Sequence, residues 1–216
     1  MSFKEKIANR AAAEIHEGQI INLGIGIPTL IPKYLAGKKK VIVHSENGIL
    51  GMGNPCKRGQ ADRNLIDAGG TYVTIEPGAS FFDSALSFSL IRSGRLDLSI
   101  IGALQVSATG DIANWIIPGK YAPGIGGGME LAQKSRRLVI TTTHTTRDGK
   151  PKILERCDLP LTAKGRVNTI ITELAVIEVV NDGLQLRELA EETDIDTVLS
   201  LTAADIRIPQ GHIPRF

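Results

Sequence analysis

Between residues 41 and 48 the chain reads Val41-Ile42-Val43-His44-Ser45-Glu46-Asn47-Gly48. The first three residues form a short, continuous and β-branched apolar run, which is typical of a strand buried on both faces of a sheet. Polar residues and a glycine follow at once, so the pattern predicts a strand that ends in a turn. Functional groups gather at such strand ends in open α/β sheets, and this edge is therefore where we look for chemistry.

Similar apolar runs lie along the rest of the chain and alternate with helical patterns. We predict further strands at residues 19–23, 71–75, 96–103, 138–143 and 169–180, and helices at 29–35, from Ser80 onward and at 187–193. This alternation indicates an α/β fold with a mostly parallel sheet. Two Asp-Gly pairs, at 148–149 and 182–183, predict hairpin turns. We therefore expect an α/β fold with a mixed, mostly parallel sheet and helices on both faces.

Two predicted helices carry clear start signals. Ser2 caps the first helix, Glu5 completes a capping box, and Gly18 stops the run. Its apolar face repeats every fourth residue, at Phe3, Ile7, Ala11 and Ile15. Ser80 followed by Asp83 marks the start of the later helix. The buried stripe that we expect on it consists of Phe82, Leu86, Leu90 and Ile91.

Composition limits the classes of protein to consider. The 216 residues suffice for one domain, 1–216, and the apolar fraction of 42% excludes a disordered chain. A net charge of +2 and few aromatic residues argue against nucleic-acid or membrane-surface binding. With no signal peptide or long apolar run, and with Cys56 and Cys157 far apart, we expect a cytoplasmic protein with reduced thiols.

Two short basic clusters stand out locally, Lys38–Lys40 and Lys134–Arg137. Short basic runs are common on solvated surfaces, and that interpretation is favoured for both. The alternative is that they help to hold a ligand that carries phosphate.

Glu46 is the strongest candidate for a catalytic residue. A carboxylate at the end of an apolar strand is costly to desolvate, and Gly48 beside it allows a bulky ligand to approach. Asn47 adds an amide that can donate to a developing oxyanion, so the stretch suits covalent catalysis by a carboxylate. Spacing alone leaves a structural role open, in which Glu46 caps the turn or pairs with a lysine.

Two glycine-rich segments are further candidates. The first, residues 22–28, contains Gly24 and Gly26 at the end of a predicted strand. The second, residues 124–131, leads into a helix, and its backbone N–H groups are suited to an anion or oxyanion. Its spacing is not that of a dinucleotide fingerprint, and a loop that needs glycine only for its turns is the alternative.

The spacing of the histidines does not indicate a metal site. None of the four has metal-ligand spacing, so we predict no metal site. His44 and His144 each end a predicted strand and are within reach of the site, although buried structural histidines fit the pattern equally well.

The segment Ser45-Glu46-Asn47-Gly48-Ile49-Leu50-Gly51 resembles the catalytic signature of the beta subunits of 3-oxoacid coenzyme A transferases, the family of acetate, acetoacetate and succinyl types. Other segments resemble that family in the same order: residues 22–29, 77–84, 114–120 and 144–152. The similarity runs from about residue 19 to about residue 180 and so covers most of the chain.

The resemblance implies a function. It makes Glu46 the nucleophile that carries coenzyme A (CoA) as a glutamyl thioester between an acyl-CoA and a carboxylic acid of the 3-oxo or short-chain class. Asn47, Gly126 and Gly127 become candidates for the oxyanion or thioester site, and further substrate-binding candidates are Gly24, Gly26, Gly48, Gly128 and Met129. No cofactor or metal is implied beyond the CoA thioester itself.

The resemblance also implies a partner, a homologous alpha subunit in a heterodimer or heterotetramer. The chain departs from the family pattern at several positions: Gly128 stands for alanine, Glu130 for aspartate and Leu86 for a common aspartate, and Asn54 and the Asn168-Thr169 pair also differ. Two alternatives stay open at this point, an acyl-CoA hydrolase on the same fold and a non-catalytic ligand-sensing domain of the sugar-isomerase-like type.

Overall fold

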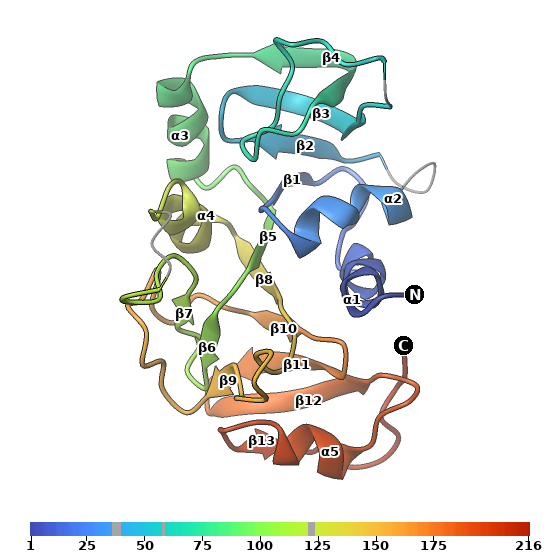
Figure 1. Ribbon diagram of the computed structural model, residues 1–216, viewed down its shortest axis with the longest axis vertical. Coiled ribbons are helices and arrows are strands. Elements are labelled where there is room, and N and C mark those ends of the chain that lie inside the picture. Colours follow the sequence, from blue (N-terminus) through green and yellow to red (C-terminus); the bar gives the residue numbers. More distant parts are fainter. Residues whose placement is uncertain (36–39, 58, 121–123) are drawn as a thin grey trace.

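The computed structural model describes residues 1–35, 40–57, 59–120 and 124–216. The sequence predicts that the helix at 29–35 closes near Gly37, but Gly37 lies outside these ranges, as do Lys38 and Lys39 of the first basic cluster. Within them the strands form one sheet of ten and a second of three (Figure 1).

The large sheet runs across the whole molecule. Its strands, in spatial order, are β13 (Ile206–Arg207), β12 (Gly183–Leu189), β11 (Ala175–Val180), β10 (Thr169–Ile171), β8 (Arg137–Thr141), β5 (Leu98–Gly102), β1 (Ile20–Leu23), β2 (Ile42–Ser45), β3 (Ile49–Pro55) and β4 (Val73–Phe81). The small sheet consists of β7 (Ile112–Ala113), β6 (Gln105–Ser107) and β9 (Ile153–Leu154). The helices are α1 (Phe3–Ala12), the 3₁₀ turn η1 (Ile27–Leu30), α2 (Pro32–Leu35), α3 (Ser84–Arg92), α4 (Gly128–Lys134) and α5 (Ile195–Ser200).

The centre of the large sheet is parallel and its flanks are largely antiparallel. Strands β10, β8, β5, β1 and β2 all run in one direction, so their carboxyl ends share one edge. β3 and β4 add antiparallel strands on one side, and β11 and β12 do so on the other. The predicted mixed, mostly parallel α/β sheet is confirmed, and the Asp182-Gly183 turn joins β11 to β12 as expected.

Helices cover both faces of the sheet. On one face α1, η1 and α2 pack against β1, β5 and β8 through Ile7, Ile31 and Ile100, all fully buried. On the other face α3 and α4 pack through Ile91 and Leu131, while the small sheet and α5 cover the strands beyond them. This coverage leaves the carboxyl edge of the parallel strands as the open end of the sheet.

The N-terminal helix forms as predicted but ends earlier. Ser2 and Glu5 make the expected capping box, and Ile7 and Ile15 are fully buried. Phe3, however, is 69% exposed, and α1 ends at Ala12 because the chain turns toward β1 there. The helix expected at 29–35 is split into η1 and α2.

The start of α3 differs from the prediction. Asp83 is the N-cap and accepts the N–H of Leu86, whereas Ser80 belongs to β4, where it pairs with Leu50. Of the expected stripe, Ile91 is fully buried but Leu86 is 51% exposed. Strand pairing of β4 with β3 outweighs the local helix signal at Ser80.

In the second half of the chain one prediction is confirmed with a break in it and another is wrong. The β structure predicted at 169–180 is present as two antiparallel strands, because Thr172 Oγ1 accepts the N–H groups of Leu174 and Ala175 and turns the chain. The helix expected at 187–193 is instead the end of β12 and the turn after it, and Leu189 exchanges backbone hydrogen bonds with the C-terminal segment.

Two residues of the second basic cluster form ion pairs within the chain. Arg136 pairs with Asp97, and Arg137 at the start of β8 donates to Glu14. Both lie at the amino edge of the sheet, opposite the strand ends considered next.

Candidate functional site

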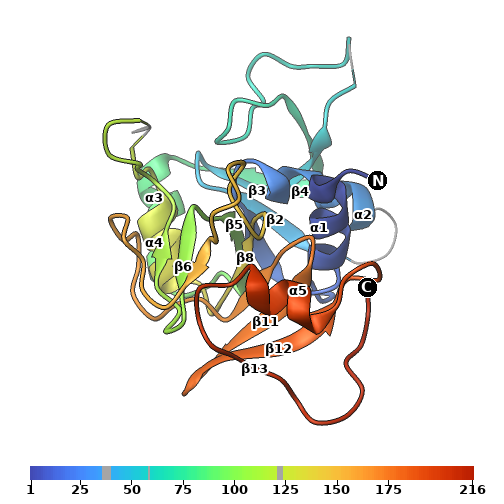
Figure 2. The same cartoon turned by 60° about the horizontal axis from the view of Figure 1, so that its bottom comes forward.

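The site lies where β2 turns into β3, at the carboxyl edge of the sheet. The N–H of Gly48 donates to the carbonyl of Ser45 at 3.0 Å, so Glu46 and Asn47 occupy the two central positions of a tight turn. Figure 2 shows the long β3–β4 connection standing out from the body of the molecule beyond this turn. Glu46 is thereby presented at the tip of a hairpin rather than within a strand.

Gly48 is needed for the geometry of this turn. Its φ is +114°, a conformation that other residues rarely adopt, and a Cβ there would overlap the carbonyl group of Phe82. In return, the N–H of Phe82 donates to the carbonyl of Gly48 at 3.0 Å. The start of α3 therefore packs directly on the turn and fixes the position of Glu46.

The Glu46 carboxylate faces the glycine loop before α4. The backbone N–H of Gly127 hydrogen-bonds to Glu46, and a Cβ on Gly127 would lie only 2.7 Å from Glu46 Cδ. Gly127 is buried beneath the half-buried carboxylate. The structure thus brings together Glu46 and Gly127, which the sequence could place only in separate motifs.

Burial raises the pKa of the Glu46 carboxyl above its ordinary value. The hydrogen bond from Gly127 opposes the rise, and the negative charge of Glu130 adds to it. Among the described residues no lysine or arginine forms an ion pair with Glu46. A half-buried carboxylate without a counter-cation is under-solvated when ionised, a condition that favours nucleophilic attack.

His44 supports the turn from beneath rather than reaching the reacting groups. Its ring is buried and lies between Asn22 Nδ2, 3.2 Å from Nδ1, and Ser87 Oγ, 2.9 Å from Nε2. An amide nitrogen only donates, so Nδ1 is the acceptor and Nε2 carries the proton. Burial lowers the pKa of His44 to about 4, which keeps the ring neutral. His144 is likewise buried between two threonine hydroxyls.

Asn47 points away from the loop that holds Glu46. Its side chain is exposed, and Nδ2 donates to the carbonyl of Ile66 at 2.7 Å, which fastens the β3–β4 connection to the turn. Its part in binding an oxyanion stays a prediction.

The first glycine loop lies beside the same connection. Gly24 packs against Ile101, where a Cβ would meet side-chain and backbone atoms at 3.1 to 3.3 Å, and Gly26 has a φ of +93°. Between them, Ile25 reaches toward Gly69. Gly24 is thus required for close packing and Gly26 for its turn, while their contact with a substrate stays a prediction.

The second glycine loop ends in α4. Gly126 has a φ of +51°, and Met129 is 38% exposed. A Cβ at Gly128 would lie 3.8 Å from the side chain of Asn114, an ordinary contact. Asn114 donates to the carbonyl of Gly102. It belongs to the family-like segment 114–120, but nothing in its sequence context indicated it as a site residue.

An ion pair beside the site was not predicted. Arg92, at the end of α3, donates to Glu130 in the first turn of α4 at 2.8 Å. The pair joins the two helices that flank Glu46 and holds the Glu130 charge near it. The substitution of Glu130 for aspartate was noted in the sequence, but its partner becomes visible only in the fold.

The described residues hold no group of three or more His, Cys, Asp or Glu side chains placed to bind a metal ion. Among them we also find no helix with the length and apolar character needed to cross a membrane.

Comparisons with known sequences indicate one family. Residues 4–201 match the coenzyme A transferase family. A probable coenzyme A transferase subunit beta of Bacillus subtilis is 51% identical over 205 residues, 95% of this chain and 94% of that one. A mitochondrial succinyl-CoA:3-ketoacid coenzyme A transferase of mouse is 46% identical over 98% of this chain, which spans only 41% of the mouse protein.

The solved structures confirm the fold. An acyl-CoA transferase from Escherichia coli O157:H7 superposes with a TM-score of 0.81 at 21% identity. That match covers 100% of this chain and 43% of the E. coli chain, so this chain is less than half as long.

Proposed function

Since the chain belongs to the coenzyme A transferase family, as a beta subunit, we propose that Glu46 is the nucleophile that passes CoA from an acyl-CoA to a carboxylic acid. The observation that carries the proposal is the Glu46 carboxylate itself. It is half-buried at the carboxyl edge of the sheet, has no described cationic partner and rests on the N–H of Gly127.

The first half-reaction loads CoA onto the enzyme. Glu46 attacks the thioester carbonyl, the C–S bond breaks, and an acyl-glutamyl anhydride and CoA thiolate form. The thiolate then attacks the glutamyl carbonyl, the donor acid leaves as its carboxylate, and CoA stays on Glu46 as a thioester. A second carboxylate attacks this thioester, and the same two steps in reverse give the new acyl-CoA and free Glu46.

Each attack places negative charge on a carbonyl oxygen. The N–H groups of Gly127 and Gly126 are our candidate donors, and the hydrogen bond from Gly127 to Glu46 supports the first of them. One such donor contributes about 3–4 kcal/mol in comparable sites. Asn47 is a third candidate. The chemistry requires no metal or redox cofactor, because the thioester supplies the energy of each intermediate.

Water must be kept from the anhydride and the thioester. Large apolar side chains are exposed around the site at Ile25, Ile66, Tyr72, Ile75, Phe81, Leu86 and Met129. An exposed apolar surface of this kind is typical of a protein interface. We propose that a homologous alpha subunit covers it, in a heterodimer or a pair of heterodimers.

The length of the mouse relative supports such a partner. This chain spans 41% of that single chain, and we propose that a separate alpha subunit corresponds to part of the remainder. The name of the mouse protein also supports a substrate class. We propose succinyl-CoA or another short acyl-CoA as donor and a 3-oxo acid as acceptor.

The test is chemical trapping. The chain, co-expressed with its alpha subunit, is incubated with acetoacetyl-CoA or succinyl-CoA, reduced with borohydride and analysed by peptide mass. Reduction of a glutamyl thioester to an alcohol lowers the mass of the Glu46 peptide by about 14 Da. The shift should be absent in Glu46→Gln. No adduct at Glu46, in a folded complex that binds CoA, contradicts the assignment.

The same complex also separates transfer from hydrolysis. A transferase turns over only when an acceptor acid is present. Release of free CoA at the same rate without any acid would assign the chain to the hydrolases instead.

A further inference from the structure

Lys152 lies at the carboxyl edge of the sheet and has no place in the reaction described above. Its Nζ donates to Thr143 Oγ1 at 2.8 Å and to Thr142 Oγ1 at 3.1 Å, just beyond the end of β8. Within the described ranges, no carboxylate forms an ion pair with it. Burial lowers the pKa of the ammonium group, and the charge of Glu173 opposes that effect.

The two hydroxyls are fixed as acceptors. Thr142 donates its own proton to the carbonyl of Ala103 at 3.0 Å, and Thr143 donates to the carbonyl of Thr145 at 2.8 Å. Each hydroxyl has one proton, so only lone pairs remain to face Lys152. The ammonium group is therefore held in one place by neutral partners, with a third N–H left over for a ligand. Such an arrangement is suited to an anion.

The distance across the sheet limits what that anion can be. Lys152 sits over β8, and Glu46 follows β2, with β5 and β1 between them. Three strand spacings separate the two residues by about 14 Å. A short acid that reacts at Glu46 does not span that distance. In CoA, by contrast, the pantetheine arm places the phosphates at about this distance from the sulfur.

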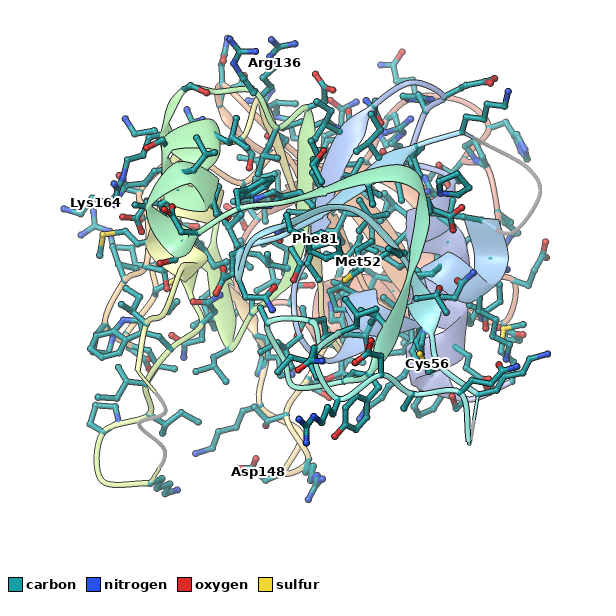
Figure 3. The ribbon with its side chains drawn as sticks, turned by 90° about the horizontal axis from the view of Figure 1, so that it is seen from above. Met52, Cys56, Phe81, Arg136, Asp148 and Lys164 are labelled. Carbon is teal, nitrogen blue, oxygen red and sulfur yellow. The ribbon has the colours of Figure 1, made fainter. Side chains whose placement is uncertain are left out.

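Two further lysines lie near Asp148, at the tip of the hairpin that carries Lys152. The hairpin at 144–152 carries Lys150 beside Asp148, whose pKa is lowered first by a hydrogen bond from Thr146 and further by the charges of Lys150 and Lys120. Lys120 therefore lies near the same tip, although it belongs to another loop. Figure 3 shows Asp148 on the side of the molecule opposite Arg136, which marks the amino edge.

We propose that Lys152, with Lys120 and Lys150 at the rim, binds the phosphate groups of the CoA substrate whose thioester lies at Glu46. The inference rests on the proposed function, because that function makes CoA the ligand. Lys152 is the fixed anchor, and the two exposed lysines add charge without fixed geometry.

The test compares two thioesters in the heterodimer. Lys152→Met should raise the KM for an acyl-CoA about ten- to a hundredfold, the effect of losing one charged hydrogen bond. It should leave the KM for the matching acyl-pantetheine, which has no phosphates, within about twofold. Lys152→Arg should recover part of the affinity. The control is Lys164→Met, an exposed lysine that Figure 3 shows well away from the Asp148 hairpin.

Three outcomes overturn the inference. An equal loss with both thioesters would place Lys152 at the reacting centre or in the fold. A rise confined to the KM for the acid would identify a substrate carboxylate as its ligand, and a loss of heterodimer would identify a partner carboxylate. If Lys152→Met does not fold, the exposed pair Lys120→Met and Lys150→Met makes the same comparison. Failure of the proposed function is distinct, since wild-type enzyme would then form no thioester at Glu46.

Discussion

Two glutamates at opposite edges of the sheet differ in almost everything except their residue type. Glu14, at the amino edge, is 4% exposed and pairs with Arg10 at 2.7 Å and Arg137 at 2.5 Å. Burial would raise the pKa of Glu14, but hydrogen bonds from these two arginines outweigh it and lower the pKa. Glu46, at the carboxyl edge, is supported by a backbone N–H and by no cationic side chain of the described part of the chain, and burial raises its pKa.

The difference separates a carboxylate that holds the fold together from one that is available for chemistry. The Glu14 network joins α1 to β8 and β12, and it lines a polar cavity of about 590 Å³. Its arginines and glutamates pair with one another, so we assign the cavity no ligand. No lysine or arginine of the described ranges pairs with Glu46, as the proposed nucleophile requires.

Glu46→Gln should show the largest effect, a loss of activity without a loss of stability. The amide is isosteric but cannot form the anhydride, so we expect turnover of the heterodimer to fall by at least about 10⁴-fold. Thermal unfolding should occur at the same temperature or slightly higher, because a poorly solvated charge is removed. Steady-state assay and calorimetry of the same sample check both. Residual activity above that bound would mean that another group attacks the thioester.

Glu14→Gln should have the opposite effect to Glu46→Gln: it should lower stability and leave the chemistry at Glu46 intact. Arg10 keeps its pair with Glu188, but half-buried Arg137 loses its carboxylate partner, and we expect a loss of about 1–3 kcal/mol in the free energy of unfolding. Urea titration measures it, with Glu178→Gln, an exposed partner of Arg187, as a control that should cost under about 1 kcal/mol. The folded enzyme should still form the Glu46 adduct.

The stabilisation of the fold by the Glu14 carboxylate should decrease as the pH falls. The folded pKa of Glu14 is lowered, so its stabilisation is present above the ordinary value and is lost as pH falls through the folded pKa. The folded pKa of Glu46 is raised, so its protonated form is the favoured one, and stability declines as pH rises through that pKa. The penalty of Glu14→Gln should therefore shrink in acid.

Charge beside Glu46 should shift the pH profile without abolishing the reaction. Removing the negative charge in Glu130→Gln should lower the pKa of Glu46 and move the acidic limb of kcat/KM to lower pH. Arg92→Met leaves Glu130 unpaired and should move the limb to higher pH. Profiles that shift in the same direction in both variants would show that the Arg92–Glu130 pair acts through structure rather than charge.

The smallest effect is expected at Gly128. Gly128→Ala restores the family's alanine, and its Cβ would meet Asn114 at an ordinary 3.8 Å. Stability should rise by about 0.5–1 kcal/mol, as for glycine to alanine in a helix, with activity retained. Gly48→Ala is the matched contrast, since it overlaps Phe82 at a positive φ and should destabilise the turn. Urea titrations of both compare them directly.

The sequence predicts the parallel centre of the sheet because each strand there is a short apolar run ending in a polar turn. It fails at residues 187–193, where Glu, Leu and Ala favour a helix but pairing with β11 and the C-terminal segment imposes a strand. Propensity is a weak preference that tertiary contacts override.

The candidate site was predictable only in part. Glu46 and the glycine loop were each visible, but not their contact, because it depends on how α4 packs beside the β2–β3 turn. Arg10 and Glu14 stand four residues apart, yet their distant partners Arg137 and Glu188 give no local signal.

The outermost strand of the sheet, β4, affects how readily the chain aggregates. β4 is nine residues long, only Val73 in it is buried, and no described strand pairs with its outer edge. An unpaired edge with exposed Ile75 and Phe81 can template β-aggregation between copies. If the proposed partner covers this edge, the chain made without it should aggregate more readily than the complex, and Pro77 within β4 is the residue that limits such pairing.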